Sequence, residues 1–94
     1  MSTPLSTDAI QSALAGLPGW SYDNDKLSKT YKHADFRAAL AFIVRIGLEA
    51  ERANHHPELL NVYSTVTISL NTHDAGGKVT GKDVALAKAI EAIG

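Results

Sequence analysis

The chain has 94 residues, with ten acidic and nine basic side chains, a net charge of −1 and no cysteine. A nearly neutral chain without a basic cluster is not suited to nucleic-acid backbones or anionic membranes, so we expect neither as a partner. Without cysteine there are no disulfides or thiolate metal sites, and no apolar signal-peptide segment opens the chain, so the cytoplasm is the expected compartment.

One domain is expected over residues 1–94, because so short a chain has room for a single hydrophobic core. Residues 1–5 are expected to form a loose end. A short helix follows, which Ser6 or Thr7 can cap and which residues 16–18 end with a glycine and a proline. Its apolar stripe consists of Ile10, Ala13, Leu14 and Leu17.

A first β-hairpin is predicted next, with strands at residues 20–22 and 27–32 and an Asp- and Asn-rich turn at 23–26. A long helix then begins at the cap Asp35 and runs to about Ala53. Its predicted core face consists of Phe36, Leu40, Ile43, Gly47 and Ala50, widened by Ala39, Phe42 and Ile46. Val44 and Leu48 extend the apolar surface further, which predicts a second contact, between subunits.

A second hairpin is predicted from strands at residues 59–63 and 66–72, joined at Ser64-Thr65. This turn would place Tyr63 opposite Val66, with Leu60 and Val62 beside Thr67 and Ser69.

The spacing Thr80-x-x-Asp83 is typical of a capping box and predicts a last helix with an apolar stripe at Leu86, Ala89, Ile90 and Ile93. The element order α-β-β-α-β-β-α predicts an α+β fold. Its four-stranded antiparallel sheet would carry the helices on one face.

Three of the four histidines lie in one stretch, at His55, His56 and His73. Pro57 disfavours the α region for the residue before it, so the helix should stop here and the two neighbouring rings should diverge. His73 shares the strand parity of Thr67, Ser69 and Asn71, and so should close a polar site from across the hairpin. Imidazole, with a reference pKa of ~6.5, is well suited to carry protons near neutral pH.

Other interpretations of these residues remain open at this point. Isolated histidines are usually structural or exposed, and three imidazoles with water can also form a zinc site. Adjacent histidines rarely chelate one ion, and no H-E-x-x-H spacing is present, so no metal is expected. Glu51 is equally an exposed helical carboxylate, Asp83 a capping residue and Trp20 a core residue.

The run Glu51-x3-His55-His56-Pro57-x5-Tyr63-x9-His73-x9-Asp83 resembles the signature of the pterin-4a-carbinolamine dehydratases, also called 4a-hydroxytetrahydrobiopterin dehydratases. The resemblance extends over roughly residues 18–93. It includes the segments Asp35-Phe36-Arg37-Ala38, Ala41-Phe42-Ile43-Val44-Arg45, Asn61-Val62-Tyr63, Thr72-His73-Asp74 and Asp83-Val84-Ala85-Leu86-Ala87.

The resemblance implies a dehydratase that converts 4a-hydroxytetrahydropterin into quinonoid dihydropterin and water, in the recycling of tetrahydropterin used by aromatic amino acid hydroxylases. It implies neither a metal nor a redox cofactor. His55 and His73 would transfer protons, His56 would place the pterin, and Glu51 and Asp83 would support them. The implied substrate contacts are Asn54, His55, His56, Asn71, Thr72, His73 and Trp20.

The sequence departs from the family pattern at three places. Asn54 stands where an aspartate is common and Asn71 where a serine is common, and the loop 74–82 is one residue longer than in animal relatives.

The family implies a homodimer joined edge to edge through its sheets, or a homotetramer. Because some members bind a transcription factor or act as assembly factors, a non-enzymatic protein-binding module is the alternative function.

Overall fold

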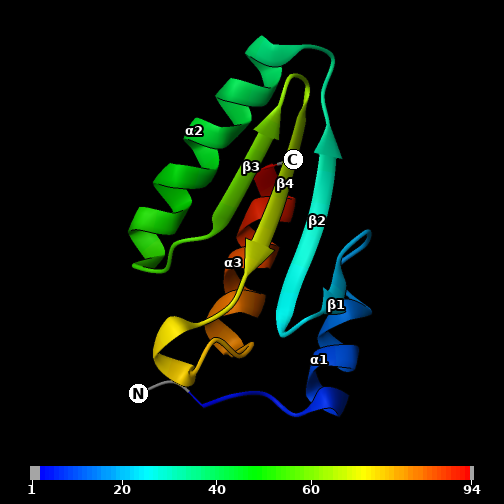
Figure 1. The fold of residues 1–94 in the computed structure, drawn as a ribbon, viewed down its shortest axis with the longest axis vertical. Helices are drawn as coiled ribbons and strands as arrows, with labels where there is room; N and C mark the ends of the chain where they lie inside the picture. The colour runs from blue at the N-terminus through cyan, green and yellow to red at the C-terminus, as the bar shows by residue number, and fades with distance from the viewer. Residues whose placement is uncertain (1–2, 94) are drawn as a thin grey trace.

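The computed structural model describes residues 3–93. In this range the helices are α1 (Thr7–Leu14), α2 (Phe36–Ala53) and α3 (Gly81–Ile93), with a short 3-10 helix η1 (His73–Ala75). The strands are β1 (Ser21–Asp23), β2 (Lys26–Lys32), β3 (Glu58–Val62) and β4 (Thr65–Leu70) (Figure 1). The predicted order α-β-β-α-β-β-α is confirmed, with η1 as an addition.

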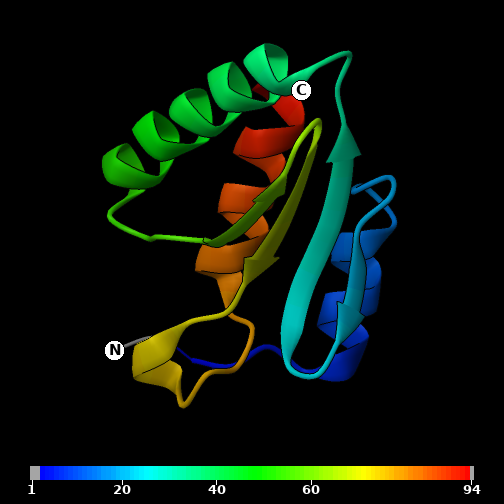
Figure 2. The same ribbon diagram turned by 45° about the horizontal axis from the view of Figure 1, so that its top comes forward.

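The four strands form one antiparallel sheet in the order β1-β2-β4-β3. Figure 2 shows α3 behind this sheet, α1 behind β1 and α2 along the side of β3. The predicted α+β fold, with its helices on one face of the sheet, is therefore confirmed. No helix among residues 3–93 has the length and apolar character needed to cross a membrane.

Strand parity separates the two faces of the sheet. The side chains of Leu27, Val66, Ile68 and Leu70 are fully buried beneath the helices. On the opposite face, hydroxyl pairs join β2 to β4: Ser28 to Ser69 at 3.1 Å and Thr30 to Thr67 at 2.9 Å. The sheet thus has an apolar face toward the core, as expected for an antiparallel sheet covered on one side. Its open face is polar along β2 and β4, whereas the edge strand β3 exposes Leu60 and Val62 there.

The predicted core face of α2 is partly wrong. The buried residues are Ala39, Phe42, Ile46 and Ala50, which pack toward α3 and β4. The apolar side chains at the i+4 positions Phe36, Leu40, Val44 and Leu48 are 52%, 47%, 56% and 67% exposed. Two neighbouring apolar stripes therefore run along α2. The buried stripe contains the small residues Ala39 and Ala50, which allow α2 to lie close to α3 and β4. We call the four exposed residues the outer stripe of α2.

Both hairpin turns contain two residues, which corrects their predicted positions. The second turn is Tyr63-Ser64, because Val62 pairs with Thr65 and Val66 pairs with Asn61. Tyr63 has φ 52° and is 83% exposed, so it lies in the turn and not opposite Val66. The first turn, at residues 24–25, has positive φ values at both of its residues. Consecutive left-handed residues match the twist of short hairpins, and this conformation was not evident from residue type alone.

The segment before α1 pairs with the end of the loop that precedes α3. Pro4 forms a bridge with Thr80, and the Leu5 N–H donates to the Val79 carbonyl at 2.9 Å. Pro4 and Leu5 are therefore held in place, which corrects the expected loose end at these positions, while residues 1–2 lie outside the described range. Ser6 caps α1 by accepting from the Ala9 N–H at 3.1 Å.

The carboxylate of Glu91 joins three parts of the fold at the end of α3. It accepts from Trp20 Nε1 at 3.1 Å, from Lys29 Nζ at 2.6 Å and from the Tyr31 hydroxyl. Burial alone would raise the pKa of Glu91, but hydrogen bonds from Lys29, Tyr31 and Trp20 together hold it below its usual value of 4.5. Burial, and then the hydrogen bond to Glu91, raise the pKa of Tyr31 above its usual value.

These contacts predict that Glu91→Gln lowers the free energy of unfolding at pH 7 by about 1–3 kcal/mol, because three donors lose a charged acceptor. A carboxyl whose folded pKa is lowered stabilises the fold above its unfolded pKa, and this contribution disappears as the pH falls below about 4.5. Urea titrations at pH 7 and below pH 4 measure both effects.

The matched control is Glu58→Gln, which removes a 70% exposed carboxylate paired with Lys26 and should change stability by less than about 0.5 kcal/mol. Equal losses in the two variants, or a Glu91→Gln penalty that persists unchanged in acid, would contradict this account.

Candidate active site

The histidine pair follows directly from the end of α2. Asn54 adopts the left-handed conformation at φ 51° and caps the helix, its backbone N–H donating to the carbonyls of Ala50 and Glu51. Asparagine tolerates this conformation better than most residues, so the cap accounts for an Asn at this position. The chain then turns away from the helix axis before Pro57, which presents His55 and His56 on a connecting segment.

The two adjacent imidazoles bond to different carboxylates. His55 Nε2 lies 2.5 Å from Asp83 Oδ1, and His56 Nε2 lies 2.8 Å from Glu51 Oε1. The predicted divergence of the rings is therefore observed. The His55 side chain is 11% exposed and Asp83 is fully buried, whereas the side chains of His56 and Glu51 are 59% and 79% exposed. Only the first pair is shielded from solvent, so only there is the ring orientation strongly held.

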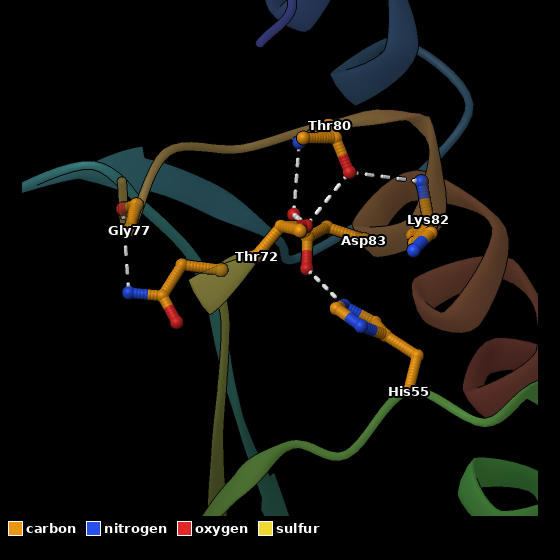
Figure 3. Close-up of polar contacts among 7 residues, drawn as sticks. His55, Thr72, Gly77, Thr80, Lys82 and Asp83 are labelled. Carbon is orange, nitrogen blue, oxygen red and sulfur yellow. Dashed lines mark hydrogen bonds and ion pairs between the residues drawn. The ribbon is translucent and has the colours of Figure 1, made fainter. Parts of the chain in front are cut away.

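Asp83 has a structural role and a site role at once (Figure 3). Its Oδ2 accepts from the Thr80 N–H at 2.8 Å, which is the capping-box bond expected at the start of α3. The same oxygen accepts from the Thr72 hydroxyl at 2.8 Å, while Oδ1 faces His55. The longer loop before Asp83 thus still delivers its carboxylate to the histidine.

His73 reaches the site from η1 and not from a strand end. Strand β4 ends at Leu70, two residues earlier than expected, and Thr72 forms an isolated bridge with Lys78 that starts the loop. His73 is the first residue of η1 and is exposed. The pairing of β4 with β2 stops at Leu70, which pairs with Leu27 near the start of β2 at the hairpin turn.

A cleft of about 420 Å³ connects these elements, and its volume lies in the range of small-molecule sites. Its lining includes every predicted residue of the two substrate segments and two that sequence reasoning missed, Asp74 and Lys82. Asp74 was visible within the run Thr72-His73-Asp74, and Lys82 as the neighbour of Asp83 at the start of α3. The full lining is Asn54, His55, His56, Asn71, Thr72, His73, Asp74 and Lys82.

Two predicted site residues are placed differently. Trp20 is 6% exposed, lies in the core and donates to Glu91, which is eight residues or about 12 Å along α3 from Asp83. It does not line the cleft of this chain, because its side chain is part of the hydrophobic core. Thr72 lines the cleft but is 2% exposed, and its hydroxyl bonds to Asp83.

Within residues 3–93, no three His, Asp or Glu side chains are arranged to hold a metal ion.

Comparisons with known proteins give one consistent result. The family model described as "Pterin 4 alpha carbinolamine dehydratase" matches residues 3–93. A protein from Opitutus terrae, provisionally named pterin-4-alpha-carbinolamine dehydratase, is 54% identical over 93 residues, covering 99% of this chain and 96% of that protein. A similarly named protein from Solibacter usitatus is 50% identical over 93 residues, covering 99% of this chain and 97% of its own length.

A solved structure is similar over the whole fold. The crystal structure of a transcriptional coactivator/pterin dehydratase from Brucella melitensis has a TM-score of 0.91 and 32% identity. The alignment covers 97% of this chain and 98% of that one.

Proposed function

The chain belongs to the pterin 4 alpha carbinolamine dehydratase family, and we propose that it dehydrates 4a-hydroxytetrahydropterin to quinonoid dihydropterin by histidine acid–base catalysis. The observation that carries this proposal is the buried His55–Asp83 pair on a cleft that His73 also lines. The product returns to the tetrahydropterin pool after reduction by another enzyme, which makes the reaction a recycling step.

The reaction needs one acid and one base. The C4a–O bond breaks as the hydroxyl accepts a proton and leaves as water, while the N5 lone pair forms the new double bond to C4a and N5 gives up its proton. One proton is donated and one is collected, so no redox partner is required. Well-placed acids and bases accelerate such steps by ~10²–10⁴-fold.

His55 is suited to collect the N5 proton. A carboxylate only accepts hydrogen bonds, so the ring nitrogen facing Asp83, Nε2, carries the hydrogen. This leaves Nδ1 as the basic nitrogen of the ring. His73 is exposed on the same cleft, exchanges protons readily with solvent and protonates the departing hydroxyl.

The remaining polar residues of the cleft orient the substrate. His56, paired with Glu51, presents its ring at the rim. Asn71 donates its amide to the Gly77 carbonyl at 3.3 Å, which leaves its own carbonyl oxygen to accept from the pterin. Asn54 adds a second amide. Trp20 is not part of this set.

The direct test is an assay of purified protein for loss of a synthetic 4a-hydroxytetrahydropterin, measured above the spontaneous background and repeated after exhaustive chelation. The proposal expects an accelerated rate that chelation does not change. A rate equal to the background would overturn the dehydratase function. Stoichiometric zinc in the protein, with activity lost on its removal and restored on its return, would replace the proton-transfer mechanism by a metal-activated water.

We also propose that the protein acts as a homodimer or homotetramer. The outer stripe of α2 exposes four large apolar side chains. The edge strand β3 lies beside α2 (Figure 1). An edge strand and an exposed apolar stripe are both surfaces that proteins normally cover.

Light scattering at micromolar concentration should therefore give a native mass of two or four times the chain mass of 10.0 kDa. The double variant Val44→Glu/Leu48→Glu should weaken association by about tenfold or more, because it places charges in a desolvated contact. Gln11→Glu, on the exposed face of α1, is the control and should leave the mass unchanged. A wild-type mass of 10.0 kDa would remove this proposal.

The alternative function is a protein-binding module. The name of the Brucella melitensis structure includes a coactivator role, and the same outer stripe of α2 can contact a different protein. Such a module needs none of the three histidines of the cleft. Absence of dehydration above background, together with an intact fold and assembly, would favour this function over the enzyme.

A further inference from the structure

We propose that Thr72 and Thr80 are positioning residues that hold His55 in the tautomer with a basic Nδ1. The inference rests on the proposed function for its kinetic consequence, but its structural content is independent of that function. It also reassigns Thr72, whose hydroxyl contacts Asp83 instead of the substrate.

Four polar groups form a continuous chain behind His55 (Figure 3). The Lys82 N–H donates to Thr80 Oγ1 at 3.2 Å, and Thr80 Oγ1 lies 2.7 Å from Thr72 Oγ1. Thr72 Oγ1 lies 2.8 Å from Asp83 Oδ2, and Asp83 Oδ1 lies 2.5 Å from His55 Nε2. The chain therefore runs from the first turn of α3 to the imidazole on the cleft.

The direction of every hydrogen bond in this chain follows from the donors available. The Asp83 carboxylate can only accept, so the single hydroxyl hydrogen of Thr72 points to it. Thr72 must then accept from Thr80, whose own oxygen accepts from the Lys82 amide. One consistent arrangement remains, and it ends with the hydrogen of His55 on Nε2.

Burial makes this arrangement difficult to replace. Thr72 and Thr80 are each 2% exposed and Asp83 is fully buried, so each group in the chain depends on its protein partners. Deprived of the Thr72 hydroxyl, the carboxylate loses one of the two donors on Oδ2, the other being the Thr80 N–H. A carboxylate with fewer donors is held less firmly against His55, so we expect the hydrogen of His55 to distribute between its two nitrogens.

The experiment uses the full-length chain with Thr72→Val, Thr80→Val and Thr72→Ser. Long-range proton–nitrogen NMR of ¹⁵N-histidine-labelled protein reads the tautomer of His55 without any reference to activity. The control is Thr67→Val on β4, which removes a hydroxyl bonded to Thr30 on the open face of the sheet.

In the wild type and in Thr67→Val, His55 should show one tautomer, with a pyrrole-type Nε2 and a pyridine-type Nδ1. Thr72→Val should give a mixture and lower kcat by about 3- to 10-fold with KM unchanged, since part of a general-base contribution is lost. Thr80→Val should have a smaller effect in the same direction, because its backbone N–H still binds Asp83. Thr72→Ser should restore the single tautomer.

An unchanged tautomer in both valine variants overturns the proposal, whatever happens to the rate. A raised KM with unchanged kcat in Thr72→Val overturns it as well, in favour of a substrate contact. If Thr72→Val does not fold, Thr80→Val carries the same test. A tautomer shift in a protein that lacks dehydration activity would support the positioning role while refuting the proposed function, so the two failures are distinguishable.

Discussion

Alanine at His55 or at His73 should lower kcat for 4a-hydroxytetrahydropterin by about tenfold or more, because each replacement removes one partner of a two-proton reaction. His56→Ala should chiefly raise KM, since its exposed ring is paired with Glu51 at the rim and provides uniform binding. Steady-state kinetics, corrected for spontaneous dehydration, separate the two patterns.

The fourth histidine supplies the control. His33 lies outside the cleft, in a tilted contact with Phe42 whose ring centroid is 4.8 Å away. His33→Gln should leave kcat unchanged, after circular dichroism has verified the fold of each variant. Wild-type rates in folded His55→Ala, His73→Ala and the double variant would refute the assignment of proton transfer to these residues.

Among the variants of the candidate active site, Asp83→Ala should produce the largest loss of stability, about 3–5 kcal/mol in the free energy of unfolding. The carboxylate is fully buried and accepts from Thr72, Thr80 and His55, so its removal leaves three donors without an acceptor and weakens the start of α3. Domains are typically stable by only about 5–15 kcal/mol, so a clearly lower urea midpoint is expected.

Asp83→Asn should keep most of the fold but lose activity. The amide oxygen must still accept from Thr72 and Thr80, which turns the amide NH₂ toward His55. The ring then accepts at Nε2 and carries its hydrogen on Nδ1, so Nδ1 is no longer basic. We expect kcat to fall by about 10- to 100-fold.

The control for this change is Glu51→Gln, the same isosteric replacement in the exposed pair with His56. Its effect on stability should stay below about 0.5 kcal/mol and its effect on kcat should be small. Similar kinetic losses in the two variants would show that the buried Asp83–His55 pair has no special role.

Local signals in the sequence were sufficient for the order of elements and for their caps. The Ser6 and Asp35 caps, the end of α2 near Ala53 and the Thr80–Asp83 capping box all appear in the structure. Each depends on residues within four positions of one another, so the information is contained in short segments of the chain.

The face of α2 that is buried could not be decided in this way. The helix has two adjacent apolar stripes, and periodicity alone does not say which one meets α3 and β4. The exact positions of the turns were also undecided, because the positive φ values of Asn24, Asp25 and Tyr63 arise only when the strands pair.

Residue types and the family resemblance indicated which residues gather at the site, but only the tertiary structure decided how they contact one another. His55, Thr72 and Asp83 come from the end of α2, the segment after β4 and the first turn of α3. The sequence contains no measure of whether Thr72 faces the substrate or Asp83, or whether Trp20 faces the cleft or the core. These orientations depend on how the helices lie against the sheet, because burial and hydrogen bonding between distant segments select one side-chain direction only after packing.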